Sequence, residues 1–455
     1  MERWVKIRAI CWAAAVLALA LGLVSPSSAQ EISEAASVRG HFAYGDGVWR
    51  ADDFGWFYYD LDEDLGGEML QIDLDGRTAE KGHMAYSSKV WKEQFEYRPW
   101  GSFQRVAFFG KPYFAGYPES SFTEEVSSLE KGELREVLMD DDITQTLSLN
   151  KTLTLQQGYV LVAQEISEKK GTVNFLLFKD GLPVNSSVVS IGESFVYKID
   201  DLPVILVHLT NAMLGAGEGL AEVEGVFQIS DEPNIRLFEG AMIGEMKIID
   251  YSQSVIEIES SISINLRRDS TINLAPGFDL VVLDSQDLVY YPQGWIYDYG
   301  LHDIRGPTFS SISSIPVSMG QYNSSVIARW NAENYSGFYF DPDDATLRDM
   351  FGALIGETLV IYPMEGRRIE PGRSPVKIPE NMTLLQTGLQ YTSLRQPKKF
   401  DYEPWGVYYA INLFGLPFFA GYDSSFEGYK APKSLMENEY LGQVLLDSKL
   451  QGNIS

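Results

Sequence analysis

The sequence predicts an all-β protein made of tandem β-sandwich modules, and three observations lead to this prediction. Apolar residues recur at every second position, not with the helical period of 3.6. Short β-branched or aromatic runs are separated by Gly, Pro, Asp and Asn, which favour turns. Hydrophobic residues make up 45% and aromatic residues 13% of the 455 residues, which is enough for packed cores. After residue 30, no stretch shows a long amphipathic helical pattern with caps.

The clearest strand pattern is Ser254–Leu266, in which the residues Ile256, Ile258, Ile262 and Ile264 fall on one side and polar residues fall mostly on the other. The segment 173–191 predicts two strands joined at Asp180-Gly181, a hairpin turn signal. Leu202–Leu209 and Asp279–Asp284 are short β-branched runs with turn residues at their ends. Together these patterns favour sandwiches of many short strands.

Residues 1–29 have the pattern of a signal peptide. Arg3, Lys6 and Arg8 form a basic head, residues 9–24 are almost uninterruptedly apolar, and Ser27-Ser28-Ala29 offers small residues for cleavage. The alternative is an uncleaved membrane anchor, but the apolar run is short for a span of about 20 residues. We therefore expect export and a secreted or cell-surface location.

Removal of this segment would leave a cysteine-free, strongly acidic chain. The only cysteine, Cys11, lies within it, and the formal charge changes from −27 to −29. An exported chain without thiols has no disulfides and no cysteine metal site. A surface this acidic repels nucleic acid and anionic lipid and attracts cations, so nucleic-acid partners are excluded.

Two parts of the chain repeat each other. Residues 95–117, FEYRPWGSFQRVAFFGKPYFAGY, match residues 400–422, FDYEPWGVYYAINLFGLPFFAGY, at 12 of 23 positions. WRADDFGWFYYDLD at 49–62 matches WNAENYSGFYFDPD at 330–343, and each copy opens on Arg-Gly, at Arg39-Gly40 and Arg305-Gly306. We expect a complete first repeat over residues 30–302, with two linked β-sandwiches, and a partial second repeat over 303–455.

These paired motifs, followed by VLMDDD at 137–142, resemble the S-layer proteins of Methanosarcina-type methanogenic archaea. Residues 201–233 resemble the centre of that family's repeat, and WIYDYGLHDIRG at 295–306 resembles its end. The resemblance covers about residues 39–455. It implies two linked sandwiches per repeat, self-association into a porous two-dimensional coat, and neither a catalytic residue nor an organic cofactor.

The C-terminal part departs from this family pattern. Family members complete the second repeat and continue into a polar stalk and a transmembrane helix, whereas residues 430–455 contain no apolar run of about 20 residues. We expect no direct membrane span after signal cleavage. The chain would then be a truncated relative, or it would be held by lateral contacts or by a membrane-anchored full-length S-layer protein. A sheath component is the alternative.

The repeated aromatic stretch is interpreted as core filler. Residues 97–101 are expected to turn a corner, where Pro99 fixes φ and Gly101 allows close approach under Trp100. Ala115 and Gly116 are expected to leave room for large rings. The alternative is an exposed platform on which sugars stack, as in a carbohydrate-binding adhesin.

Acidic clusters offer oxygen ligands for structural Ca²⁺ or Mg²⁺. The candidate metal ligands are Asp60, Asp62, Asp64, Asp140, Asp141 and Asp142. The sequence at 60–71 does not fit an EF-hand, because Leu65 and Gln71 replace the required Gly and Glu. The alternative is a set of solvated turn residues.

Sequons for N-glycosylation are more frequent than chance, which predicts roughly two. Six occur, at Asn150, Asn185, Asn323, Asn334, Asn381 and Asn453. Export would make them reachable, and glycans would add bulk to the outer face.

Catalysis has little support in the sequence. The four histidines form no HExxH motif, and His208 is most simply a structural residue of a strand. No nucleophile elbow or phosphate-cradling glycine loop is present. A secreted glycosidase with a carboxylate pair is the remaining enzyme alternative, and it would need two carboxylates about 5–9 Å apart across a cleft.

Overall fold

The computed structural model describes most of residues 36–296 and separate segments of the remaining chain. The described residues are 36–61, 63–149, 151–214, 219–296, 305–308, 315–319, 322–326, 328–339, 356–369, 384–393, 396–400 and 403–422. The predicted signal peptide, residues 1–29, lies outside them and stays a prediction. The described chain is all-β, as predicted from the alternating hydrophobicity.

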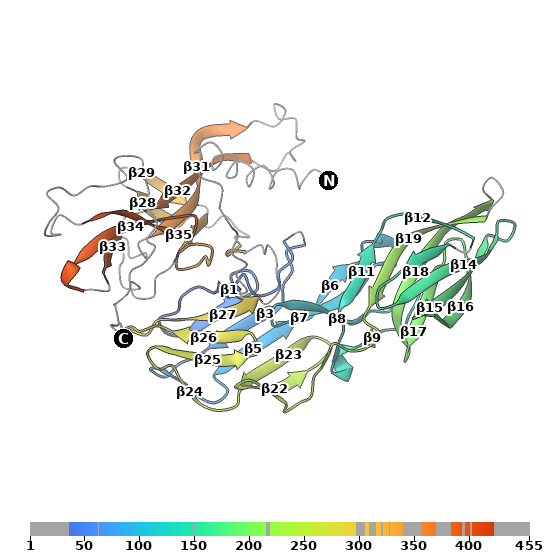
Figure 1. The fold of residues 1–455 in the computed structure, drawn as a ribbon, viewed down its shortest axis with the longest axis horizontal. Helices are drawn as coiled ribbons and strands as arrows, with labels where there is room; N and C mark the ends of the chain where they lie inside the picture. The colour runs from blue at the N-terminus through green and yellow to red at the C-terminus, as the bar shows by residue number, and fades with distance from the viewer. Residues whose placement is uncertain are drawn as a thin grey trace, which may run out of the picture. The chain divides into compact units, whose positions relative to one another are not determined.

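The first core lies between two sheets whose strands come from both ends of residues 36–296. One sheet has the order β2-β3-β5-β23-β22-β21 and the other has the order β1-β27-β26-β25. Strand β5, in blue, lies beside the yellow-green β23 (Figure 1). The bounds are β1 Ala36–Arg39, β2 Gly47–Arg50, β3 Glu68–Ile72, β5 Met84–Lys89, β21 Met242–Ile243, β22 Met246–Tyr251, β23 Val255–Ser260, β25 Ser270–Ala275, β26 Phe278–Val282 and β27 Tyr290–Ile296.

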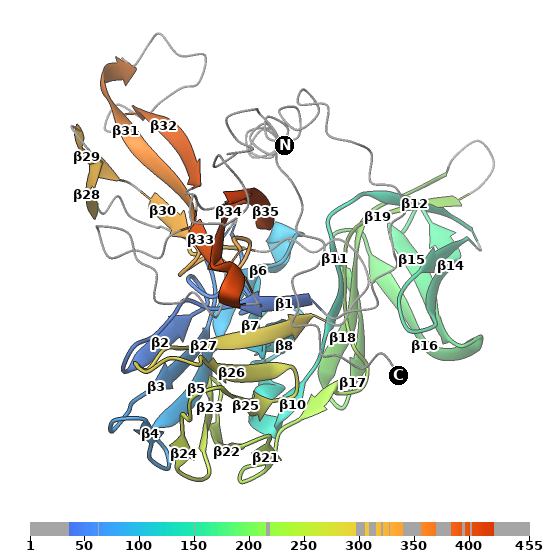
Figure 2. The same cartoon turned by 60° about the vertical axis from the view of Figure 1, so that its left-hand side comes forward.

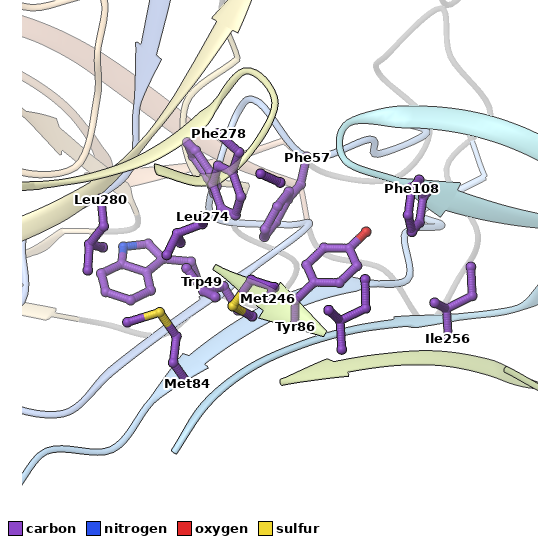
Figure 3. Close-up of a cluster of buried hydrophobic side chains, with 14 of the residues drawn as sticks. Trp49, Phe57, Met84, Tyr86, Phe108, Met246, Ile256, Leu274, Phe278 and Leu280 are labelled. Atoms are coloured by element: carbon purple, nitrogen blue, oxygen red, sulfur yellow. The ribbon is translucent and has the colours of Figure 1, made fainter. Parts of the chain in front are cut away.

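Large side chains from both sheets fill this core. Trp49, Leu70 and Ile258 are fully buried on one sheet, and Leu280 and Tyr290 are fully buried on the other. Figure 3 shows part of the cluster, in which the Phe57 ring lies 6.0 Å from Tyr86 and 5.8 Å from Phe278 between ring centroids. Burial of such rings is the main stabilising contribution available to a chain whose only cysteine is Cys11.

The second core lies between two sheets formed by residues 137–229, and aromatic rings from residues 95–117 also pack in it. Its sheets have the orders β13-β14-β15-β16 and β11-β19-β18-β17, with β12 also paired to β19. These strands gather at the end of Figure 1 coloured cyan to green, and Figure 2 shows the same group after rotation. The bounds are β11 Val137–Asp141, β12 Gln145–Ser148, β13 Thr152–Thr154, β14 Tyr159–Ser167, β15 Thr172–Lys179, β16 Leu182–Ser190, β17 Ser194–Ile199, β18 Leu202–Leu214 and β19 Gly219–Ile229.

A four-stranded sheet, β6-β7-β8-β9, carries the first aromatic stretch. Several short strands and two 3-10 turns complete this part of the chain. The 3-10 turn η1 separates β6 from β7. The bounds are β4 Thr78–Ala79, β6 Trp91–Gln94, η1 Arg98–Trp100, β7 Ser102–Phe108, β8 Lys111–Tyr117, β9 Val126–Ser127, η2 Leu129–Lys131, β10 Glu133–Leu134, β20 Ile235–Arg236 and β24 Ile264–Asn265. Strand β10 pairs with β20, and β4 pairs with β24.

The second copy repeats the strand pattern around its matching motifs. Its described sheets are β28-β29, β30-β31-β32 and β33-β34-β35. The bounds are β28 Ile315–Met319, β29 Tyr322–Val326, β30 Ala328–Asn331, β31 Glu357–Ile369, β32 Leu384–Ser393, β33 Gln396–Lys399, η4 Glu403–Trp405, β34 Val407–Leu413 and β35 Leu416–Tyr422. Strands β34 and β35 correspond to β7 and β8 of the first copy, so the shared sequence forms the same hairpin twice.

The predicted strand patterns are mostly confirmed. Asp180 and Gly181 have φ of 51° and 78° in the turn between β15 and β16, as expected for a two-residue hairpin turn. Ile256 and Ile258 are fully buried, but the placement of Ile262 with them is wrong because its side chain is 53% exposed. Strand β23 ends at Ser260, so the alternation does not continue through Ile262.

Candidate functional site

The repeated aromatic stretch of the first copy packs inside the protein and contributes to both cores. Along β8, Tyr113 and Ala115 belong to the first core, whereas Phe114 and Tyr117 belong to the second. Successive side chains of a strand point to opposite faces, which separates Phe114 from Tyr113 and Ala115. A register shift in the pairing with β7, with one extra residue on β8, then turns Tyr117 to the same core as Phe114. Phe103 on β7 packs in the second core, with its ring centroid 4.9 Å from that of Phe227. The core-filler interpretation is confirmed for this copy.

The predicted corner exists at η1. Gly101 has φ of 85°, so it supplies a left-handed backbone that other residues rarely adopt. Apart from its two chain neighbours, no atom would lie within 4 Å of a Cβ at Gly101, and its expected close approach to the adjacent Trp100 stays a prediction. At Gly225, a Cβ would lie 2.6 Å from Cγ of Tyr97, so this glycine allows close packing against the corner.

Gly116 also has a different role from the predicted one. A Cβ at Gly116 would lie 2.5 Å from the carbonyl oxygen of Val126 on the neighbouring strand β9. The missing side chain makes room for backbone pairing and not for an aromatic ring. The prediction that Gly116 accommodates large rings is wrong because the nearest contact is main chain.

A short series of polar contacts holds the corner at η1 against the second core. The Trp100 indole Nε1 donates to Oγ of Ser194 at 3.0 Å, and that Oγ lies 3.1 Å from Nδ1 of His208. The His208 ring stacks on Tyr97 with a centroid distance of 4.8 Å, and burial lowers the pKa of His208. His208 thus has the structural role that the sequence indicated, and the Ser–His pair anchors a corner.

A buried carboxylate that sequence reasoning missed organises the turn between β7 and β8. Glu68 is 2% exposed. Its Oε1 accepts hydrogen bonds from the Tyr86 hydroxyl and the Gly110 N–H, both at 2.8 Å, and its Oε2 accepts from the Tyr58 N–H at 2.7 Å. Burial raises the pKa of Glu68 to about 7 although three donors face it. The enclosed carboxylate is out of reach of a substrate.

The second copy contains the same arrangement around Glu357. Its Oε1 accepts from the Tyr391 hydroxyl at 2.6 Å and from the Gly415 N–H at 3.0 Å, and its Oε2 accepts from the Tyr339 N–H at 3.1 Å. The available sequence signal was the shared Gly-Glu-x-Leu pattern, at residues 67–70 and 356–359. This carboxylate is therefore part of the repeated architecture.

The candidate metal ligands are not brought together into a metal site among the residues that the structure describes. Asp62 lies outside those residues. Asp60 accepts from the Glu63 N–H at 3.1 Å, and Asp64 accepts from the Tyr59 hydroxyl. These two side chains hold a turn, which matches the alternative interpretation of this cluster.

The second acidic cluster lies at the end of strand β11. Asp140 accepts from the Glu96 N–H at 3.0 Å, and Asp141 accepts from the Ile143 N–H at 2.7 Å. Adjacent strand residues point to opposite faces, so Asp140 and Asp141 do not converge, whereas Asp142 is exposed beyond the strand. Burial raises the pKa of Asp140 to about 7.

Three of the six sequon asparagines lie in described segments. Asn185 is half-buried on β16, the terminal strand of its sheet, and Asn323 lies on β29. Asn334 is held in a turn, where its Nδ2 donates to the Arg329 carbonyl at 3.1 Å and its Oδ1 accepts from the Asn331 N–H at 2.9 Å. The sequons at Asn150, Asn381 and Asn453 lie outside the described residues.

The second copy of the aromatic stretch is more exposed than the first. Trp405 is 54% exposed, whereas its counterpart Trp100 is 7% exposed. Ala420 is fully buried, like Ala115 in the first copy.

Within the described parts of the chain, no helix has the length and apolar character needed to cross a bilayer.

Comparison with protein-family models matches the family described as S-layer protein, over residues 38–284 and 319–455. The chain is similar to the major S-layer protein of Methanosarcina barkeri, with 25% identity over 393 residues, covering 79% of this chain and 55% of the relative. The major S-layer protein of Methanosarcina acetivorans is 25% identical over 276 residues, which cover 56% of this chain and 40% of the relative. The major S-layer protein of Methanosarcina mazei is 24% identical over 273 residues, which cover 56% of this chain and 39% of the relative. The chain thus spans about half the length of these curated relatives, or less.

Proposed function

Because the chain belongs to the S-layer protein family, we propose that it is a structural subunit of an archaeal cell-surface layer and not an enzyme. The subunit would be exported, glycosylated and acidic, and it would tile with copies of itself into a porous coat. A coat subunit must keep its shape and its edges, and it needs no substrate cleft.

The observation that carries this proposal is the burial of the repeated aromatic rings in the first copy. Phe95, Phe103, Phe114 and Tyr117 are fully buried, so they stabilise the module and are not available as a sugar-binding surface. This burial favours a structural role over the adhesin alternative. Two related copies per chain give two related surfaces, from which contacts can extend without closing.

Lateral contact is supported by the character of an edge strand. Strand β16 ends the sheet β13-β14-β15-β16, and it exposes Leu182 to 70%, Val184 to 40% and Val188 to 66%. Natural proteins usually protect such edges with charges or prolines, because an exposed apolar edge pairs with other chains. Strand β16 has one proline, Pro183, and no charged residue. An apolar edge of this kind would suit lateral contact in a tiling subunit.

Two features of the predicted coat, its bound cations and its retention at the membrane, belong to the same proposal. The acidic clusters would bind Ca²⁺ or Mg²⁺ loosely and screen the repulsion between subunits with a charge near −29. If this is correct, EDTA loosens an assembled layer and added Ca²⁺ restores it. An unchanged layer and melting curve in EDTA would remove cations from the proposal. A membrane-anchored S-layer protein is the proposed partner for retention.

The proposal is tested by assembly of the purified chain. Negative-stain electron microscopy of the concentrated protein is expected to show ordered sheets with diffraction spots, assembled from the chain alone or together with an anchored S-layer protein. A matched variant, Val188→Lys, places a charge on the β16 edge and is expected to reduce sheet size while leaving the circular dichroism spectrum unchanged. A chain that stays monomeric under both conditions would contradict the coat function.

A further inference from the structure

The Arg-Gly pair that opens each copy begins a short segment with the same local structure in both. We call residues 39–42 arm 1 and residues 305–308 arm 2. The Trp49 indole donates to the His41 carbonyl of arm 1 at 2.8 Å, and the Trp330 indole donates to the Pro307 carbonyl of arm 2 at 3.0 Å. Each arm therefore rests on the tryptophan of its own copy.

Glycine is required at the second position of each arm. A Cβ at Gly40 would lie 2.9 Å from Cδ1 of Trp49, and a Cβ at Gly306 would lie 2.8 Å from Cδ1 of Trp330. These distances are below ordinary van der Waals contact, so only glycine lets the arm pass over the ring. The glycine of each repeated Arg-Gly pair thus lets the backbone of the arm pass close to the tryptophan ring of its own copy.

The backbone of each arm binds the other copy. We call residues 51–57 cup 1 and residues 332–338 cup 2. The Thr308 N–H of arm 2 donates to the Asp52 carbonyl of cup 1 at 2.7 Å, and the Phe42 N–H of arm 1 donates to the Glu333 carbonyl of cup 2 at 3.2 Å. Phe42 and Thr308 hold the same place in their arms, and Asp52 and Glu333 hold the same place in their cups. The two bonds are therefore equivalent and run in opposite directions.

The side chains of Arg39 and Arg305 also bind the cup of the other copy. Nη2 of Arg305 donates to the carbonyls of Ala51, Phe54 at 3.0 Å and Phe57 at 3.2 Å in cup 1. Nη2 of Arg39 donates to the carbonyls of Ala332 at 2.7 Å and Tyr335 at 3.4 Å in cup 2. Ala332 and Tyr335 are the counterparts of Ala51 and Phe54.

Guanidinium groups suit these cups for two reasons. Each offers several N–H donors in a rigid fork, which can satisfy a ring of carbonyl oxygens at once. Each also lies over aromatic rings, with Cζ of Arg39 at 4.7 Å from the Phe42 centroid and Cζ of Arg305 at 5.0 Å from the Tyr59 centroid. Burial lowers the pKa of Arg39 only to about 10, so the group stays charged at neutral pH.

We propose that the exchange of arms forms a pseudo-two-fold interface that joins the two copies, with Arg39 and Arg305 as its anchors. The partner recognised by cup 1 is arm 2 of the same chain, and the partner recognised by cup 2 is arm 1. An interface whose two halves are equivalent and reciprocal is isologous, the arrangement of a closed pair. The two copies then act as one rigid unit, whether or not the chain forms a coat.

A disulfide across one half of the interface tests the proposal on the full chain. In a Cys11→Ser background, Asp52→Cys and Thr308→Cys place thiols on two residues whose backbones are hydrogen bonded. Mild oxidation is expected to give a cross-link within one chain, seen as a faster monomer band on a non-reducing gel and as a joined peptide by mass spectrometry. Asp201→Cys with Thr308→Cys is the control, because Asp201 lies at the β17–β18 turn of the second core.

The arginines are tested in the same cysteine background. Arg305→Ala is expected to slow cross-linking about tenfold, the effect of losing one hydrogen-bonded charged group, and Arg305→Lys by less. Arg39→Ala is expected to slow it as well, although Arg39 belongs to the other half of the interface. A purely local role for Arg39 would leave the rate unchanged.

Two outcomes would overturn the proposal. Cross-linking no faster than in the control pair would show that the two copies do not share this interface. Cross-linked dimers in place of cross-linked monomers would show that cup 1 recognises arm 2 of a second chain. Neither result would bear on assembly of the coat, which is measured separately by microscopy.

Discussion

The buried carboxylate at Glu68 predicts a pH-dependent contribution to stability. Burial raises its pKa from 4.5 to about 7 in the folded chain, so the folded state holds this proton more tightly than the unfolded state. Between about pH 4.5 and pH 7 the unfolded state binds fewer protons, and the stabilisation is lost as pH rises through that window. A difference of about 2.5 pKa units corresponds to about 3 kcal/mol.

The variant Glu68→Gln isolates this contribution because glutamine does not titrate. Glutamine also turns an NH₂ group toward the Tyr58 N–H, which leaves donors unsatisfied at a cost of about 1–3 kcal/mol. The loss of unfolding free energy relative to the unmodified chain is therefore expected to be larger at pH 4.5 than at pH 7.5, by about 3 kcal/mol.

The measurement is urea unfolding followed by tryptophan fluorescence at several pH values. Glu257→Gln is the matched control, because Glu257 is exposed on strand β23 of the same sheet, and its effect is expected to stay within about 0.5 kcal/mol at every pH. An equal cost of Glu68→Gln at pH 4.5 and pH 7.5 would show that burial does not raise the pKa of this carboxylate.

Three further predictions follow from the geometry. Trp100→Ala is expected to lower the free energy of unfolding by about 3–5 kcal/mol and Trp405→Ala by clearly less, because Trp405 is half exposed; equal losses in chemical denaturation would contradict this. Gly101→Ala forces a side chain into φ of 85° and is expected to cost at least about 1 kcal/mol, which an unchanged denaturation midpoint would disprove. Glycopeptide mass spectrometry is expected to find more glycan at Asn185 than at Asn334, whose amide nitrogen is hydrogen bonded in a turn; the reverse ratio would show that the folded turn does not protect it.

Local patterns were enough to predict the strand class and the hairpin turns. Asp180-Gly181 adopts the expected left-handed conformations, because few residues other than Gly, Asn and Asp tolerate positive φ. Alternation also identified Ile256 and Ile258 as buried. It was wrong at Ile262, because where a strand ends is decided by the neighbour with which it pairs, and Ser260 is the last paired residue of β23.

The roles of glycines were harder to predict than their importance. Gly116 was expected to make room for rings, yet it admits a neighbouring strand, and Gly101 was not expected to be a position of positive φ. Gly225, which lies against Tyr97, is far from the aromatic stretch in sequence. Such contacts depend on tertiary packing, and a single sequence does not specify them.

The repeated polar contacts were missed for the same reason. Glu68 meets Gly110 and Tyr86 only after three separate elements come together. Arg39 and Arg305 were noted as the start of each copy, but their exchanged partners lie more than 240 residues away along the chain. Comparison of the two copies position by position would have marked these residues as candidates without giving their contacts.

The central claim is that paired β modules fit side by side into a surface layer, with their aromatic rings serving as internal filler. Electron cryotomography of native envelopes, with subtomogram averaging and a tag inserted at the exposed turn around Asp201, tests it most directly. The expected result is a periodic lattice with one tag density per subunit, into whose averaged density the two cores of residues 36–296 fit. An envelope whose lattice lacks the tag, together with tagged monomer found only in the medium, would contradict it.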